Sequence, residues 1–173
     1  MKTALAPALA ALLCLGLAAC STSPTSMRLV DTKSPAQLLR NEAANRLITG
    51  TDEIVVEQSD SSAACKSATE DPEGLYRSWR SSLLAGVPAD SAIGVDQFVG
   101  ALATSFSEDG WVFTEAHDAS EKVTTMTRSD SIVTLTFTST EDVGDGASVA
   151  IVAVGPCVLT AGPDSDEVTG LEG

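Results

Sequence analysis

The most regular pattern in the chain is an apolar stripe with a helical period. Its members recur at i, i+3, i+4, i+7 and i+11: Val95, Phe98, Val99, Leu102 and Phe106. This spacing predicts an amphipathic helix, which Glu108-Asp109-Gly110 then ends. We expect it to be the main helix of the core.

An earlier helix is predicted from its end signals. Ser34 is a good N-cap, Pro35 suits the first helical position, and Gln37 completes a capping box. Apolar residues then follow at intervals of four: Leu39, Ala43 and Leu47. Gly50 is the expected end of this helix.

Between these helices the sequence predicts two strands. Glu53–Gln58 is a short β run, and a polar loop, Ser59–Gly74, follows it. Leu75–Leu84 has apolar residues that fit either a helix face or a strand. The Pro and Gly residues that closely flank it favour a strand.

After the second helix the apolar period changes to two. Four β runs are joined by short polar turns: Trp111–His117, Val123–Arg128, Ser131–Thr138 and Ala147–Val154. In the third run apolar residues alternate with threonines, which indicates one covered and one open sheet face. The last run is apolar on both faces, so we expect it inside the sheet with an earlier strand beside it. The fold class is therefore α+β: one antiparallel β-meander of about five to six strands, with helices packed on one face.

The amino-terminal pattern is that of a secreted protein. Lys2 precedes an apolar run, Ala4–Ala19, which is shorter than the roughly 20 residues that a membrane-spanning helix needs. The run ends in Leu17-Ala18-Ala19-Cys20, which resembles the lipobox of bacterial lipoproteins at all four positions. The resemblance implies cleavage before Cys20 and a diacylglycerol thioether, often with an acylated amine, on that residue. An ordinary signal peptide or an uncleaved anchor is the alternative.

These features divide the chain into four parts. We expect a lipoprotein signal peptide at 1–19, a lipidated cysteine with a flexible tether at 20–33, a single α+β domain at 34–159, and an acidic disordered tail at 160–173. The expected location is the extracytoplasmic face of the cell membrane, to which the lipid on Cys20 attaches the chain.

Two cysteines remain once Cys14 is removed and Cys20 is lipidated. Cys65 and Cys157 are expected to form a disulfide in an oxidising compartment, and the chain has no C-x-x-C motif to favour a metal site or a reactive thiol. Closing a loop of about 93 residues would stabilise the fold by roughly 4–5 kcal/mol at most. We also expect the bridge to bring the Glu53–Gln58 strand and the last run together.

Charge excludes one class of partner. Removing residues 1–19 discards Lys2, so 24 acids would face nine bases, a net charge of −15. Such a surface repels nucleic acid. No cofactor or metal is predicted, because His117 is the only histidine and the acids of Glu141–Gly146 lack EF-hand spacing.

No catalytic motif is found, so we do not expect an enzyme. The sequence favours a non-catalytic binding or accessory module of the cell envelope, with an envelope protein or a small apolar or wall-derived ligand as its partner. Trp111 and Phe113, with the second helix, are the candidate ligand-facing residues. The alternative is an envelope hydrolase that uses paired carboxylates.

The arrangement of elements resembles one group of proteins. Gly155-Pro156-Cys157 after a helix and a meander is similar to small single-domain lipoproteins of high-GC Gram-positive bacteria. That resemblance implies no particular activity, because the functions of these proteins are largely unknown.

Overall fold

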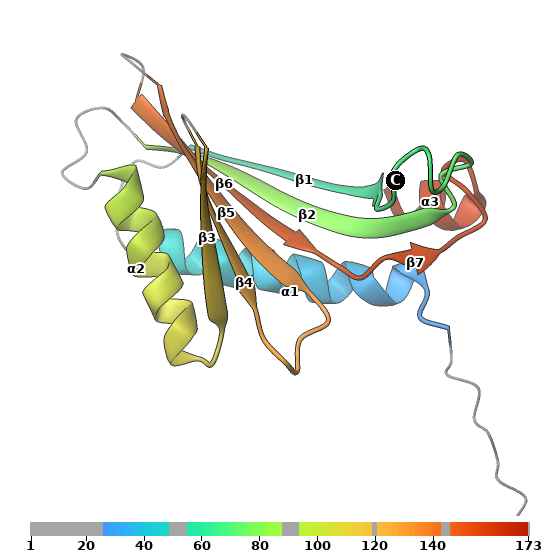
Figure 1. The fold of residues 1–173 in the computed structure, drawn as a ribbon, viewed down its shortest axis with the longest axis horizontal. Coiled ribbons are helices and arrows are strands. Elements are labelled where there is room, and N and C mark those ends of the chain that lie inside the picture. The colour runs from blue at the N-terminus through green and yellow to red at the C-terminus, as the bar shows by residue number, and fades with distance from the viewer. Residues whose placement is uncertain (1–25, 49–54, 88–93, 119–120, 143–145, 173) are drawn as a thin grey trace, which may run out of the picture.

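The computed structural model describes residues 26–48, 55–87, 94–118, 121–142 and 146–172. These ranges form three helices and seven strands (Figure 1). In chain order they are α1 (Leu29–Ile48), β1 (Val55–Ala64), β2 (Tyr76–Val87), α2 (Val95–Glu108), β3 (Val112–Asp118), β4 (Glu121–Thr127), β5 (Thr134–Asp142), β6 (Gly146–Val154), β7 (Val158–Leu159) and α3 (Asp166–Glu172).

The strands form one antiparallel sheet in the order β1-β2-β6-β5-β4-β3, and β7 pairs with β2. β3 to β6 are the predicted meander, and each pairs with its neighbour in the chain. β6 lies between β5 and β2, so the prediction of an interior last strand is confirmed. The strand interpretation of Leu75–Leu84 is also confirmed, because these residues enter or form β2.

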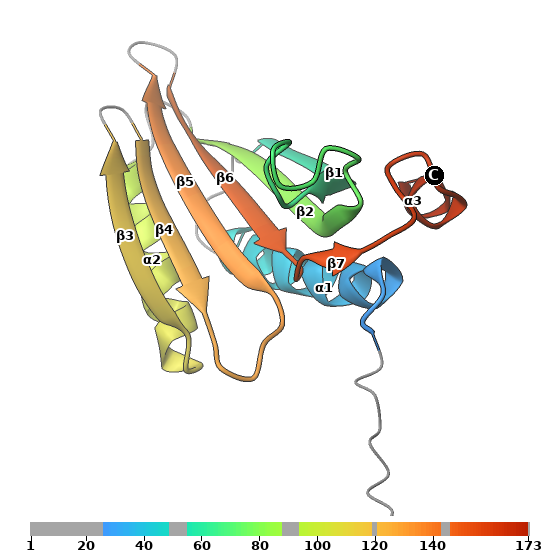
Figure 2. The ribbon, with the colours of Figure 1, turned by 45° about the vertical axis from the view of Figure 1, so that its right-hand side comes forward.

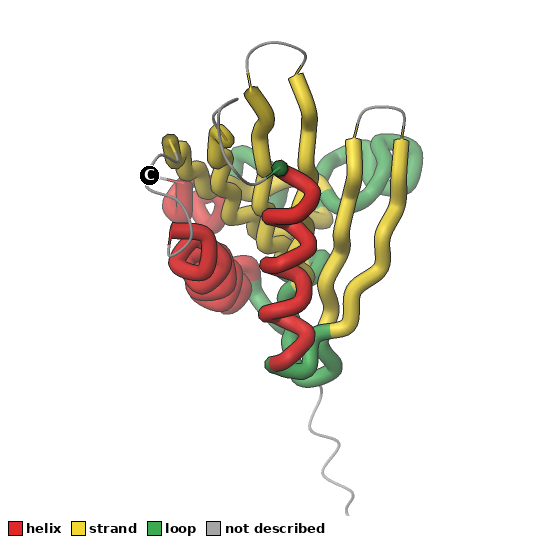
Figure 3. The backbone as a smooth tube through the Cα atoms, turned by 90° about the vertical axis from the view of Figure 1, so that its left-hand side faces the viewer, coloured by secondary structure: helices red, strands yellow, loops and turns green. Residues whose placement is uncertain are grey.

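Both long helices cover the same face of this sheet (Figures 2 and 3). α1 packs on β2 and β6, whereas α2 packs on β3 to β6. The side chains that point toward the helices are buried in alternation along β2, β4, β5 and β6, for example Leu135 and Phe137 on β5. The threonines between them, such as Thr136, are only half-buried on the opposite face. The fold class predicted from period-two alternation is therefore confirmed.

The apolar stripe of α2 is the side that the sheet buries. Val95, Val99, Leu102 and Phe106 are buried, whereas Phe98 is half-buried at the edge of the stripe. The predicted end is confirmed, because Asp109 N and Gly110 N donate to the carbonyls of Phe106 and Ser107.

α1 begins earlier than predicted, so the boundary expected at Ser34 is wrong. The helix starts at Leu29, and Pro35 lies inside it. Leu29 is fully buried against the sheet, and Arg28 N donates to the Asp31 carboxylate at 2.9 Å, which caps the first turn. Burying Leu29 outweighs the one backbone hydrogen bond that Pro35 removes. Five residues assigned to the tether are thus helical, and the predicted end at Gly50 lies outside the described residues.

β1 is longer than predicted, because the expected polar loop from Ser59 does not begin until after Ala64. Polar residues enter this strand because they find partners there. Asp60 contacts Arg40 of α1, and Ser62 contacts Arg77 of β2. Burial of hydrogen-bonded polar groups is tolerated, and an apolar period alone does not reveal it.

The carboxyl-terminal segment is not a disordered tail. Its helix α3 packs against β1 and α1, and Val168 is buried. Glu172 accepts a hydrogen bond from Ser62 N at 2.7 Å, which satisfies a donor on the free edge of β1. Seven residues give too short a pattern for the sequence to indicate this helix.

Candidate functional site

An apolar cleft lies between α1 and the turn from β4 to β5, and we call it the Trp111 cleft. It holds about 300 Å³, at the lower end of the range for small-ligand sites. It is lined by Pro35, Leu38, Leu39, Glu42, Trp111, Arg128, Asp130, Ser131, Ile132 and Val133. Three chain segments far apart in the sequence therefore contribute to one depression.

The end of α2 places Trp111 in this cleft. Gly110 has a positive φ of 84°, a conformation that favours glycine, and Trp111 N donates to Phe106 O at 3.2 Å. The Trp111 ring meets the Phe106 ring edge to face, with centroids 5.8 Å apart. Trp111 is consequently buried and forms a rigid part of the cleft lining rather than a free side chain.

Two large apolar side chains of the cleft are open to solvent. Leu38 is 69% exposed and Ile132 is 46% exposed. Single exposed apolar residues are common, but these two line the same cleft from different elements. Their burial by a ligand would remove apolar surface from water, which is the main favourable term in association.

Charged groups surround the apolar lining. The Arg128 guanidinium lies 5.0 Å from the centre of the Trp111 ring, and its Nε donates to Asp130 at 2.6 Å. Across the cleft, Glu42 accepts from Arg46 at 2.5 Å, and Arg46 also bonds to Asp109 at the end of α2. Arg46 thus joins α1 to the end of α2, and Arg128 joins the β4–β5 turn to Trp111, so the walls of the cleft are held in place.

This arrangement bears on the hydrolase alternative. Glu42 and Asp130 are two carboxylates at one cleft, as a glycosidase-type mechanism requires. Each of them forms an ion pair with an arginine of its own segment, Glu42 with Arg46 and Asp130 with Arg128. The cleft therefore combines apolar side chains with ion-paired charges at its margin.

The structure separates the two candidate ligand-facing residues. Trp111 lines the cleft, but Phe113 lies on the edge strand β3, in register with Met126, and is not part of the lining. Phe113 is 45% exposed. Between α2 and the sheet, the Phe106 ring packs against Phe137 with centroids 6.0 Å apart. The Trp111 cleft therefore contains one of the two predicted aromatics, and a site formed by both of them with α2 stays a prediction.

A partly buried polar cluster joins α1 to β1 and β2. The Asp60 carboxylate accepts from Arg40 Nη1 at 3.1 Å and from Gln37 Nε2 at 3.2 Å, and it also accepts from Ser81. Burial alone would raise the pKa of Asp60, but the hydrogen bonds from Ser81 and Gln37 and the charge of Arg40 outweigh it and lower the pKa. Asp60 is thus an ionised anchor for α1 and not a proton donor.

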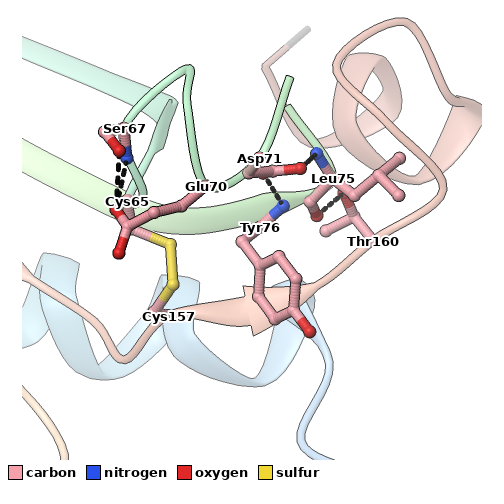
Figure 4. Close-up of a disulfide and its surroundings, with 8 residues drawn as sticks. All are labelled: Cys65, Ser67, Glu70, Asp71, Leu75, Tyr76, Cys157 and Thr160. Atoms are coloured by element: carbon pink, nitrogen blue, oxygen red, sulfur yellow. Dashed lines mark hydrogen bonds between the residues drawn. A yellow bond between two sulfur atoms is a disulfide. The ribbon is translucent and has the colours of Figure 1, made fainter. Parts of the chain in front are cut away.

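The predicted disulfide is present, with the Cα atoms of Cys65 and Cys157 5.8 Å apart (Figure 4). The two cysteines lie on opposite sides of β2. Cys65 N donates to Tyr76 O on one side, and Cys157 immediately precedes β7 on the other. β1 and β6 are therefore separated by β2, and the expectation that the bridge joins them as neighbours is wrong.

Carboxylates order the loop beside this disulfide (Figure 4). Asp71 accepts from Leu75 N at 3.0 Å and from Tyr76 N at 2.6 Å. Glu70 accepts from Ser67, which lowers the pKa of that carboxyl group. The polar composition that indicated a loop thus also supplies the hydrogen bonds that shape it.

The other candidate residues are not among those that line the Trp111 cleft. Cys20 and the rest of the lipobox are not among the described residues, and the lipid anchor stays a prediction. In the ranges that the structure describes, no helix is both long and apolar enough to cross a membrane. The same ranges contain no group of three His, Cys, Asp or Glu side chains that would hold a metal ion. His117 is placed only through its backbone, opposite Lys122.

Comparison with protein-family models, curated proteins and solved structures found no match to this chain.

The sequence pattern did not identify Leu38, Ile132 or Arg128 as site residues. For Leu38 and Ile132, however, the position along the chain did indicate exposure. Leu38 precedes Leu39 of the helical stripe, and a helix that buries Leu39 turns its neighbour by about 100° away from the core. Ile132 directly precedes Val133, so this apolar residue is likewise out of phase with the alternation that begins at Val133. Apolar residues out of phase with their element were the available indication of an exposed site.

Proposed function

We propose that this protein is an extracytoplasmic lipoprotein, anchored to the cell membrane through Cys20, whose folded domain is a non-catalytic binding or accessory module of the cell envelope. The lipobox Leu17-Ala18-Ala19-Cys20 supports the anchor. The observation that carries the binding role is the Trp111 cleft, with Leu38 and Ile132 exposed around a rigid aromatic lining.

The cleft suits a ligand that is apolar along its length and carries a polar or charged group at one end. Leu38, Ile132 and Trp111 provide apolar contact. Arg128, Asp130 and Glu42 provide one positive and two negative charges at the margin. Such a ligand is a small amphipathic molecule or an apolar side chain projecting from an envelope protein.

The anchor is tested by the Cys20→Ser variant. Its mature form is expected to leave the detergent phase, and mass spectrometry of the amino-terminal peptide should find a diacylglyceryl group on the wild type only. Cys14→Ser is the matched control, because it changes a cysteine within the segment expected to be removed. Unchanged detergent partitioning of Cys20→Ser would show that the anchor assignment is wrong.

The binding role is tested by removing the exposed apolar groups of the cleft. Wild type and a Leu38→Ser, Ile132→Ser double variant are isolated from membranes in mild detergent, and stoichiometric co-purifying molecules are measured by mass spectrometry. The double variant should lose a species that the wild type retains. Leu84→Ser, an exposed apolar position on the opposite sheet face, should retain it. Equal recovery from all three proteins would exclude the cleft as the binding site.

A further inference from the structure

One end of the domain carries a second surface with exposed apolar side chains, which we call the anchor-side patch. It surrounds a hollow of about 430 Å³ where the start of α1, β7 and α3 meet. Its lining is Ser26, Met27, Arg28, Val30, Leu159, Glu167 and Leu171. Met27 is 39% exposed and Leu159 is 60% exposed.

The fold forces Leu159 outward. β7 is a two-residue strand that pairs with the end of β2, opposite Tyr76 and Arg77. Successive side chains of a strand point to opposite sides, so burying Val158 turns Leu159 toward solvent. Met27 lies just before α1, two residues ahead of the fully buried Leu29. Both apolar side chains are therefore held at the surface by elements that the core fixes in place.

The position of the patch along the chain indicates what covers it. Ser26, which lines the hollow, is six residues after Cys20. A fully extended segment of six residues spans at most about 20 Å. A lipid on Cys20 would consequently hold this end of the domain within reach of the bilayer surface. α2 and β3 lie at the other end of the molecule (Figure 1).

We propose that the anchor-side patch rests on the lipid surface of the membrane, with Met27 and Leu159 inserted into the interfacial region. This inference rests on the proposed anchor at Cys20. Apolar side chains favour the boundary between headgroups and acyl chains, and a tether turns weak contact into stable contact by raising the effective concentration.

The charge of the patch and of the whole chain indicates which lipid headgroups it would contact. Arg28 is the only base among the residues that line the patch, and Glu167 opposes it there. The mature chain as a whole has an excess of acids, so anionic headgroups would repel it. We therefore infer a contact with zwitterionic or uncharged headgroups, through apolar side chains rather than through a basic surface.

The experiment places a tryptophan on the patch in the full-length lipidated protein. The Leu159→Trp variant is reconstituted into phosphatidylcholine vesicles whose acyl chains carry bromine, which quenches tryptophan emission on contact. Trp79 and Trp111 are both buried and supply a constant background that the unmodified lipidated protein measures. Leu159→Trp should lose emission relative to the same protein in unbrominated vesicles, and its emission should shift to shorter wavelength.

The matched control is Leu84→Trp, an exposed position on the open sheet face. It should keep its emission in both kinds of vesicle. If Leu159→Trp does not fold, Met27→Trp reports on the same patch from the flank of α1. Absence of quenching at the patch, or equal quenching at position 84, would overturn the proposal.

Two further outcomes are distinguishable. Protection of the added tryptophan from aqueous iodide without bromine quenching would show that a second copy of the chain covers the patch, and the lipid contact would be wrong. Intact mass measured on the same sample separates the two proposals. A lipidated protein without quenching contradicts only the contact, whereas a protein without lipid contradicts the anchor and the contact together.

Discussion

Gly155 lies so close to Thr32 that a Cβ added to Gly155 would come within 2.8 Å of the Thr32 Cβ. The backbone after β6 is thereby in direct contact with the buried side of α1. Gly155 N also donates to Trp79 O at 2.9 Å, so the close approach is fixed from both sides. The glycine of the Gly155-Pro156-Cys157 motif therefore has a packing role.

Gly155→Ala should destabilise the protein, because the backbone of α1 or of the segment after β6 must move. Such overpacking costs roughly 1–3 kcal/mol, measurable by urea unfolding. Gly100→Ala is the control and should stabilise the protein. Nothing lies within 4 Å of a Cβ added at Gly100, and alanine is more favourable than glycine in a helix interior by about 1 kcal/mol. A Gly155→Ala variant as stable as the wild type would contradict the close contact.

Asp60→Asn should lower the free energy of unfolding at neutral pH. It should also make that free energy fall less steeply as the pH decreases. The pKa of Asp60 is lowered in the folded state, so its contribution is present above the unfolded pKa and is lost as pH falls through the folded pKa. Wild type should therefore lose stability below about pH 5, and the variant less steeply. At pH 7 the variant should lose roughly 3 kcal/mol, because Arg40, which is 5% exposed, loses its charged partner.

Urea unfolding at a series of pH values measures this effect. Asp130→Asn is the control, since Asp130 forms an exposed ion pair with Arg128 and should change stability by less than about 1 kcal/mol. Parallel pH profiles for wild type and Asp60→Asn would contradict the role of the partly buried polar cluster.

Leu102→Ala should cost roughly 2–5 kcal/mol, because it removes a buried side chain of α2 and leaves a cavity. Gln97→Ala, on the exposed side of the same helix, should stay within about 0.5 kcal/mol. Denaturant melts of both variants compare the two faces directly. Equal effects would show that the stripe is not the buried face.

Replacing Cys65 and Cys157 together with serine should lower the melting temperature by several degrees without abolishing the fold. The bridge closes a long loop of the unfolded chain, whereas the core of the sheet and helices forms without it. Non-reducing peptide mapping of the wild type should recover the Cys65–Cys157 pair. Labelling of both residues by a thiol reagent in the folded wild type would contradict the bridge.

The elements with a long and regular period were predictable from sequence. The stripe of α2 and the alternation of apolar residues with threonines in β5 each repeat several times, so tertiary context does not override them. An interior position for β6 beside an earlier strand was also predictable, because a strand that is apolar on both faces needs a neighbour on each side. What the pattern did not indicate was that β2 takes that place between β1 and β6.

The errors occur where polar residues are buried or where an element is short. Asp60 and Ser62 belong to a strand because Arg40 and Arg77 satisfy them, and no local pattern reveals a partner so distant in the chain. α3 has one buried valine, too little to distinguish it from a tail. Of the predicted ligand-facing residues, Trp111 lines the cleft, whereas Leu38 and Ile132 become neighbours only through the tertiary fold.

The strand order has a consequence for how the chain reaches its native state. β2 pairs with β6 across residues 80–87 and 147–154, so the two halves of the sheet meet only through a long-range ladder. A polypeptide that emerges amino-terminus first, from a ribosome or a translocation pore, holds β1 and β2 without their inner neighbour until β6 has been delivered. Pairings of such sequence separation make folding slow. The sheet is therefore completed only after β6 emerges, and the residues before β6 can pass through a pore without a finished fold until then.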